Sequence, residues 1–213
     1  MIGAAVSAKP PWGIRMDAVL LTTFIDFVCR SGTPKMTVVK EWKSRDAYDP
    51  AHDYYKRLRE GIIAVHEDGK PLSSLDGICA AASESKRTNY VAMVEAYKKW
   101  NKRKTIGWFS PTKGEWKATG MVVQVNPELG LVVDGKRHLV KLYFKAEPLA
   151  KNRAELVLHL LDTVCAKKMK EAATVAILDV RNAKLFAGAP ASTAHALQLE
   201  GEAAYWMTVW SKL

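Results

Sequence analysis

The sequence predicts an α/β fold: a mixed, mainly antiparallel sheet in an αβββαβ core that is flanked by helices. Three observations support this prediction. Apolar residues recur at helical spacing over residues 88–104 and again over 151–170, and alternating segments lie between these two ranges. The continuous apolar run TVAILDV, residues 174–180, is typical of a strand buried on both faces. The pattern before residue 86 is mainly helical, so we expect an N-terminal helical segment before the core.

The bulk composition limits the class of protein. A chain of 213 residues, of which 48% are apolar, is long enough to bury a sizeable core. We divide it into a mainly helical segment over residues 1–85 and the α/β core with a C-terminal helix over residues 86–213. The length also suits a single compact domain. The formal net charge of +10 favours anionic partners, DNA or RNA above all, although such a charge also occurs in proteins without them.

Cysteine usage and hydropathy predict a cytoplasmic protein that does not enter the membrane. The three cysteines are odd in number and form no CxxC pair, which favours reduced thiols. The one candidate targeting segment, DAVLLTTFIDFVC over residues 17–29, is shorter than a bilayer span and carries Asp26. We interpret this stretch as a buried helix.

The N-terminal third is predicted as helices with one short strand. A helix over about 16–30 precedes RSGTP, whose glycine and proline are typical of a helix end. KMTVVKEW, residues 35–42, is a candidate strand. The next helix is predicted to begin at Asp49 with Pro50 in its first turn, because apolar residues then follow at helical spacing: Tyr54, Leu58, Ile62 and Val65. A short helix is expected over about 72–82.

The helix over residues 88–104 ends in a strongly basic segment. Seven Lys and Arg residues between positions 86 and 104 stand against a single acid, Glu95. Either these cations form an ordinary solvated helix end, where they suit the helix dipole, or they bind the phosphates of a nucleic acid. The second interpretation assigns phosphate contacts to Lys98, Lys102, Arg103 and Lys104. Trp108 is then the best candidate for stacking on a base.

Three consecutive strands are expected over residues 115–126, 129–133 and 138–144, because polar and apolar residues alternate there. Asp134 and Gly135 separate the last two strands. This dipeptide is typical of a two-residue type I′ hairpin turn, which needs positive φ at both positions.

The hairpin turn fixes a register in which Val133 pairs with Lys136 and Glu128 faces Lys141. One face of the hairpin is then apolar and is predicted to be core: Leu129, Leu131, Val133, His138, Val140, Leu142 and Phe144. The other face is polar and is predicted to point away from the core: Asn126, Glu128, Gly130, Arg137, Lys141, Tyr143 and Lys145.

Two interpretations of the polar face remain open. Glu128 and Lys141 form either an exposed cross-strand ion pair or one wall of a covered cleft that receives a phosphate. In the second case Lys151 and Arg153, in the first turn of the next helix, reach the same phosphate. That helix is expected over about 151–170. It is followed by the buried strand, an edge strand over about 181–186 and a last helix over 200–213.

The stretch NPELGLVVDGKRHLVKLYF, residues 126–144, resembles the signature hairpin of the PD-(D/E)XK nuclease-like superfamily, whose core has the predicted order of elements. The resemblance covers roughly residues 88–186. It implies that Glu128 binds Mg²⁺, that Lys141 orients or activates the attacking water, and that Glu95 is the acid of the first helix and a second metal ligand. The position two before Lys141 is Leu139, where the family has an acid; Asp179 is a distant candidate to replace it.

Three functions follow as hypotheses. The first is a magnesium-dependent nuclease, a hydrolase with Lys141, Glu128 and Glu95 as catalytic residues. The second keeps the fold but only binds nucleic acid, with Arg137, Lys145, Lys151 and Arg153 joining the basic helix end in phosphate contacts. The third is a structural protein that associates with a protein partner or with further copies of itself, and whose positive charge is incidental.

Overall fold

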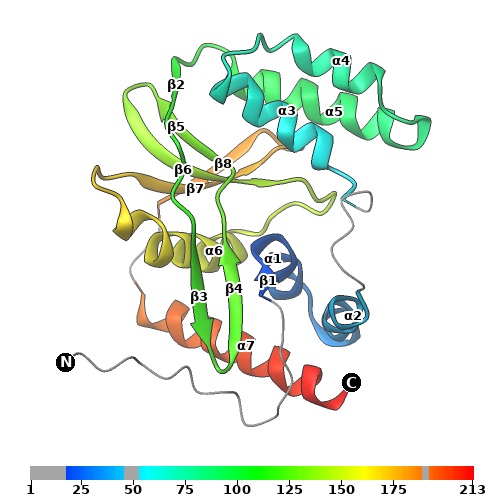
Figure 1. The fold of residues 1–213 in the computed structure, drawn as a ribbon, viewed down its shortest axis with the longest axis vertical. Coiled ribbons are helices and arrows are strands. Elements are labelled where there is room, and N and C mark those ends of the chain that lie inside the picture. The colour runs from blue at the N-terminus through cyan, green and yellow to red at the C-terminus, as the bar shows by residue number, and fades with distance from the viewer. Residues whose placement is uncertain (1–17, 46–52, 189–191) are drawn as a thin grey trace, which may run out of the picture.

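The computed structural model describes residues 18–45, 53–188 and 192–213, and these residues form two sheets and seven α-helices (Figure 1). The larger sheet has five strands in the order β2-β5-β6-β7-β8. Their bounds are Ile106–Trp108, Leu129–Val133, Lys136–Tyr143, Thr174–Asp179 and Lys184–Ala187. Within this sheet only β6 and β7 are parallel, and helix α6 (Lys151–Val164) connects them. The predicted α/β fold with a mainly antiparallel sheet is therefore confirmed.

The β5–β6 hairpin has the predicted register. Asp134 and Gly135 have φ angles of 49° and 81°, as a type I′ turn requires, and Val133 pairs with Lys136. The apolar run after α6 is the strand β7, which lies between β6 and β8, and β8 is an edge strand as expected. Because the turn sets the pairing, every residue of the hairpin lies on the face that the sequence assigned to it.

The prediction of one strand over residues 115–126 was wrong. This segment contains two strands, β3 (Gly114–Ala118) and β4 (Met121–Val125), which form a second hairpin. Its turn residues Thr119 and Gly120 have positive φ angles of 52° and 79°. The hairpin joins β1 (Val19–Leu20) in a separate three-stranded sheet of order β1-β4-β3. The strand that actually pairs with the outer edge of β5 is the three-residue β2, which is too short to produce a recognisable alternation.

The N-terminal helices differ from the prediction at two places. Helix α1 (Leu21–Cys29) is followed directly by α2 (Gly32–Lys43), so the strand predicted over 35–42 was wrong. Helix α1 ends before the Gly-Thr-Pro sequence, as predicted, but the same sequence also opens α2, with the proline in the first turn, where its missing N–H costs nothing. Helix α3 (Lys56–Glu67) begins later than predicted; the proposed cap residues Asp49 and Pro50 lie outside the described residues.

The remaining helices are close to expectation. The short helix α4 spans Ser74–Ala80, and α5 spans Glu84–Asn101. The last helix, α7, spans Thr193–Lys212 and so begins seven residues earlier than predicted. A 3-10 turn, Ala166–Lys168, follows α6. Among the described helices, none combines the length and the apolar character that crossing a bilayer would require.

Two hydrophobic cores lie on opposite faces of the five-stranded sheet. Helices α3, α4 and α5 cover the face that carries Leu129, Leu131 and Val140, which confirms the predicted core face. Helices α1, α2, α6 and α7, together with the small sheet, cover the other face. This second face was predicted to be polar and turned away from the core, and that prediction was wrong, because its Leu139 and Ile177 are fully buried. Each core contains residues from both predicted segments, 1–85 and 86–213.

A half-buried histidine beside the core under α3, α4 and α5 should make stability depend on pH. His66 on α3 lies with Nε2 2.5 Å from the hydroxyl of Tyr97 on α5, and burial lowers the pKa of His66 from 6.5 to about 4. The folded chain therefore binds fewer protons than the unfolded chain between these two pH values. We expect the free energy of unfolding to fall by about 2–3 kcal/mol as the pH drops from 6.5 to 4.

Urea unfolding of the wild type and of His66→Gln at pH 7 and pH 4.5 measures this effect. The glutamine keeps a polar partner for Tyr97 but cannot titrate, so the variant should lose less stability on acidification. Equal losses in the two proteins would show that His66 is not responsible.

Candidate nucleic-acid interface

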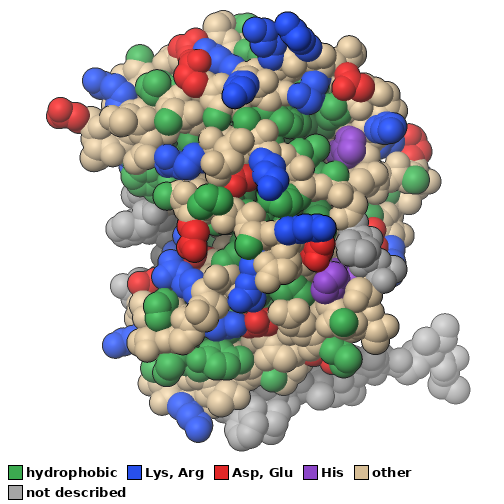
Figure 2. Space-filling model, turned by 180° about the vertical axis from the view of Figure 1, so that it is seen from behind, with side chains coloured by type: hydrophobic (Ala, Val, Ile, Leu, Met, Phe, Trp, Pro, Cys, Tyr) green, Lys and Arg blue, Asp and Glu red, His purple; other side chains and the backbone are tan. Residues whose placement is uncertain are grey.

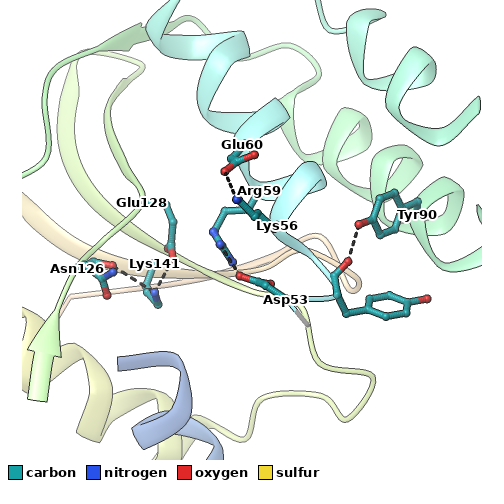
Figure 3. A network of polar contacts seen from close by, with 9 residues as sticks. Asp53, Lys56, Arg59, Glu60, Tyr90, Asn126, Glu128 and Lys141 are labelled. Carbon is teal, nitrogen blue, oxygen red and sulfur yellow. Dashed lines mark hydrogen bonds and ion pairs between the residues drawn. The ribbon is translucent and has the colours of Figure 1, made fainter. Parts of the chain in front are cut away.

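Glu128 and Lys141 meet where the hairpin register places them (Figure 3). The Lys141 ammonium donates to Oε1 of Glu128 at 2.5 Å and to the backbone carbonyl of Asn126 at 3.2 Å. The second carboxylate oxygen, Oε2, accepts a hydrogen bond from the backbone N–H of Leu142 at 2.8 Å. Only 1% of the Lys141 side chain and 9% of the Glu128 side chain are exposed.

This geometry makes the pair a buried tie between strands and not an exposed ion pair. Both oxygens of Glu128 are engaged, and Lys141 also holds Asn126, which directly follows β4. A buried charge is costly unless it is paired and hydrogen-bonded, and these contacts supply that compensation. The pair connects the small sheet to the hairpin of the large one.

The other predicted acids do not join this pair. Glu95 lies on α5, which covers the opposite face of the large sheet, and its side chain is 67% exposed beside Lys98 at 3.7 Å. Leu139 is fully buried in the second core. Asp179 is buried and accepts three hydrogen bonds, from the N–H of Leu149 and from the backbone and side chain of Asn182. Asp179 therefore fixes the chain at the end of β7.

These residues do not fit a magnesium site. Mg²⁺ needs several oxygen ligands at octahedral positions, whereas Glu128 already uses both oxygens and Glu95 lies across the sheet. Over residues 18–45, 53–188 and 192–213, no group of three or more His, Cys, Asp or Glu side chains is arranged to hold a metal ion. A magnesium site thus remains a prediction from the resemblance alone, because the described residues provide no set of ligands for the ion.

The predicted phosphate-binding cations separate into two groups at opposite ends of β6. Lys145, Lys151 and Arg153 follow its C-terminal end, and each has an acidic partner: Asp26 at 3.3 Å, Glu155 at 3.8 Å and Glu202 at 3.9 Å. Arg137 lies near the other end of the strand. From Arg137 to Tyr143 the strand extends about 20 Å at 3.3 Å per residue, so one phosphate cannot reach both groups.

The group at the N-terminal end of β6 combines two segments of the chain. The backbone of Thr105 exchanges hydrogen bonds with Asp134 in the hairpin turn, at 3.0 and 2.9 Å. This contact brings the end of α5 beside the start of β6. We call the resulting cations the basic rim: Lys102, Arg103, Lys104, Lys136 and Arg137. Lys136 was not among the predicted site residues, although its place directly after the Asp-Gly turn could have identified it.

Three members of the basic rim are available to a ligand. Lys102, Arg103 and Lys136 are exposed, and none of them forms an ion pair with any residue that the structure describes. Arg103 has a left-handed φ of 64°, so the chain turns sharply where it leaves α5. Lys98, by contrast, lies one turn earlier on α5 and binds Asp76 at 2.6 Å; this hydrogen bond raises the pKa of Lys98.

The aromatic rings near the rim are already covered. Arg137 stacks over the Phe109 ring at 4.0 Å while it binds Glu171 at 2.9 Å. Lys104 lies over the Trp100 ring at 5.1 Å. Trp108, the predicted stacking residue, is half-buried against the first core. The rim therefore offers charge to a phosphate backbone, while the rings of Phe109 and Trp100 beside it already carry a cation.

Many of the other cations lie beside acidic side chains. On the face shown in Figure 2, Lys and Arg side chains are spread from top to bottom with Asp and Glu side chains among them. Ion pairs of this exposed kind contribute little and leave little net potential around each cation. At the rim, Lys102 and Arg103 are adjacent and have no acidic partner in the described chain, a property that they share with the exposed pair Lys167 and Lys168.

Comparison of the sequence with known protein families finds no matching family model, and comparison with curated proteins finds no significant match. Function is therefore inferred from the residues and their contacts alone.

Proposed function

We propose that this protein binds nucleic acid through the basic rim and does not cleave it. The observation that supports binding is the pair of adjacent, exposed and unpartnered cations at the rim, Lys102 and Arg103, held beside Lys136 by the contact between Thr105 and Asp134. The net charge of +10 supplies long-range attraction to a polyanion.

The contacts of Glu128 and Lys141 favour binding over hydrolysis. A catalytic lysine must reach the water or phosphate that it acts on, but Lys141 is 1% exposed and is hydrogen-bonded to Glu128 and Asn126. The nuclease motif requires an acid two positions before Lys141, but this chain has Leu139 there, and Leu139 is buried. The pair is thus better suited to holding strands together than to chemistry.

Charge reversal at the rim tests the proposal. We expect Lys102→Glu with Arg103→Glu to weaken binding to a DNA or RNA duplex at least tenfold at low salt, because two phosphate contacts are lost and two repulsions appear. Fluorescence anisotropy with a labelled duplex measures the affinity.

The control for this experiment is Lys40→Glu with Lys212→Glu, which changes the net charge equally. Both lysines are exposed, and they lie on α2 and α7, which cover the opposite face of the five-stranded sheet from α5. An equal loss of affinity in both double variants would show that the rim is not the binding site. Nicking of plasmid DNA by the wild type in Mg²⁺ that disappears in Lys141→Met would contradict the claim that the protein does not cleave.

A further inference from the structure

A second group of exposed cations lies just beyond α6. Lys167, Lys168 and Lys170 belong to or follow the 3-10 turn Ala166–Lys168, and Lys113 directly precedes β3. All four side chains are exposed, and none of them forms an ion pair with any residue that the structure describes. We call them the second basic patch: Lys113, Lys167, Lys168 and Lys170.

A glycine brings the two parts of this patch together. If Gly114, the first residue of β3, carried a Cβ atom, that atom would lie 2.8 Å from the ammonium nitrogen of Lys168 and 2.7 Å from the side chain of Val164. Because position 114 has no side chain, Lys168 can lie this close to β3. Lys168 and Lys113 are therefore neighbours, although they are distant in sequence.

The second basic patch lies on the same side of the molecule as the basic rim. The segment that leads from the patch into β7 carries Glu171, which binds Arg137 of the rim at 2.9 Å. Just after this segment, Thr174 of β7 pairs with His138 of β6. In Figure 1 the chain that leaves α6 and the turn of the β5–β6 hairpin accordingly lie on one side. Glu171 is an acid between the two groups of cations, but Arg137 already offsets its charge.

The two groups are too far apart to share one phosphate, but their separation suits one long polyanion. Lys102 and Arg103 lie just before β2, and most of the patch lies just before β7. Three steps between neighbouring strands separate β2 from β7, or about 14 Å. Helices α5 and α6, which end at the rim and at the patch, cover opposite faces of the sheet, so the full separation is on the order of 20 Å. Each strand of a duplex carries one phosphate per about 3.4 Å of helix axis, so this separation corresponds to about six base pairs.

We propose that one nucleic-acid duplex binds the basic rim and the second basic patch together, over about six base pairs. This inference rests on the proposed function, because the rim supplies one of the two contacts. Each group contains exposed cations without an acidic partner in the described chain, and such cations release counterions from a phosphate backbone when they bind it.

The contacts of the nearby rings favour a duplex over a single strand. Proteins that hold single strands typically stack the exposed bases on aromatic side chains. The rings of Phe109 and Trp100 beside the rim already carry Arg137 and Lys104. A duplex keeps its bases stacked inside and presents its phosphates along the outside, so cations alone can hold it.

Charge reversal within the patch tests the proposal on two probes of different length. Lys167→Glu with Lys168→Glu should weaken binding to a duplex of about 20 base pairs by at least about fivefold at low salt. The same variant should bind a hairpin with a stem of about four base pairs as tightly as the wild type, within about twofold, because a stem of about 14 Å reaches the rim alone. Fluorescence anisotropy measures both affinities. The short stem also isolates the salt dependence of the rim from that of the patch.

Matched variants separate this inference from the proposed function. Lys113→Glu with Lys170→Glu reverses the other two cations of the patch and should weaken binding to the long duplex to a similar extent. Lys40→Glu with Lys212→Glu, on α2 and α7, changes the net charge equally and should weaken it less than either patch variant does. If the wild type binds the long duplex and both patch variants bind it as well as this control, the inference is wrong and the rim is the whole interface. If the wild type binds neither probe, the proposed function itself is wrong.

The choice of a duplex has its own test. An unlabelled single strand with the same number of phosphates should displace the labelled long duplex from the wild type at least about fivefold less effectively than the unlabelled duplex does. A single strand that competes equally well would overturn the assignment to a duplex.

Discussion

Replacement of Lys141 by alanine is expected to lower the free energy of unfolding by about 3–5 kcal/mol. The substitution leaves the Glu128 carboxylate buried without its cation, and it also removes the hydrogen bond that Lys141 gives to the carbonyl of Asn126. Since a domain of this kind is stable by only about 5–15 kcal/mol, such a loss would be visible in any unfolding experiment.

A matched double variant separates the effect of the two charges from the effect of the volume that the two side chains fill. Lys141→Met with Glu128→Gln removes both charges, keeps most of the volume and keeps an acceptor for the N–H of Leu142. We expect it to be more stable than Lys141→Ala by at least about 2 kcal/mol, because no buried charge is left alone. Urea unfolding measures both proteins. If Lys141→Ala lowers the free energy of unfolding by less than about 1 kcal/mol, the interaction of Glu128 with Lys141 is as weak as that of an exposed ion pair.

Substitution of Gly130 by alanine is expected to cost about 3 kcal/mol, at the upper end of the range for overpacking. A Cβ atom on Gly130 would lie 2.8 Å from the Phe109 ring and would also strike the carbonyl oxygen of Phe109. The N–H of Phe109 donates to the carbonyl of Gly130 at 2.9 Å, so the backbone cannot move away without loss of a hydrogen bond. Phe109 supports Arg137, and displacement of Phe109 should therefore disturb the basic rim as well.

Gly77→Ala is the control for this substitution. Gly77 lies inside α4, has no positive φ, and would place its Cβ in open space. Alanine there should stabilise the protein by about 0.5–1 kcal/mol. Thermal unfolding followed by circular dichroism compares the two variants. A Gly130→Ala protein as stable as Gly77→Ala would contradict the close contact with Phe109.

Local signals account for the parts of the fold that were predicted. The Asp-Gly turn determines the β5–β6 register residue by residue, because both of its φ angles must be positive and the pairing follows from them. The Thr-Gly turn at residues 119–120 acts in the same way, but threonine seldom adopts positive φ, so the sequence KATGMVV reads as one continuous strand. The Gly-Thr-Pro segment at residues 32–34 is ambiguous for a similar reason, since it suits either the end or the start of a helix.

The surroundings of the site could not be predicted from local patterns. Alternation along β6 shows that Glu128 and Lys141 share a face, and the structure confirms their contact. The alternation does not show what covers that face, because the covering residues come from α1, α6 and the small sheet, which are distant in sequence. Glu95 does not lie beside this pair for the same kind of reason: α5 packs on the opposite face. The basic rim likewise depends on a contact between residues 105 and 134 that no single segment reveals.

The dependence of binding on salt tests the proposed nucleic-acid interface most directly. The association constant of the full chain with a labelled duplex should fall as salt rises from about 50 to 200 mM, with a slope near −3 on logarithmic axes for about three phosphate contacts. In Lys102→Glu with Arg103→Glu the slope should become shallower by about two units. No detectable binding at about 50 mM salt, or an unchanged slope in the double variant, would contradict the account.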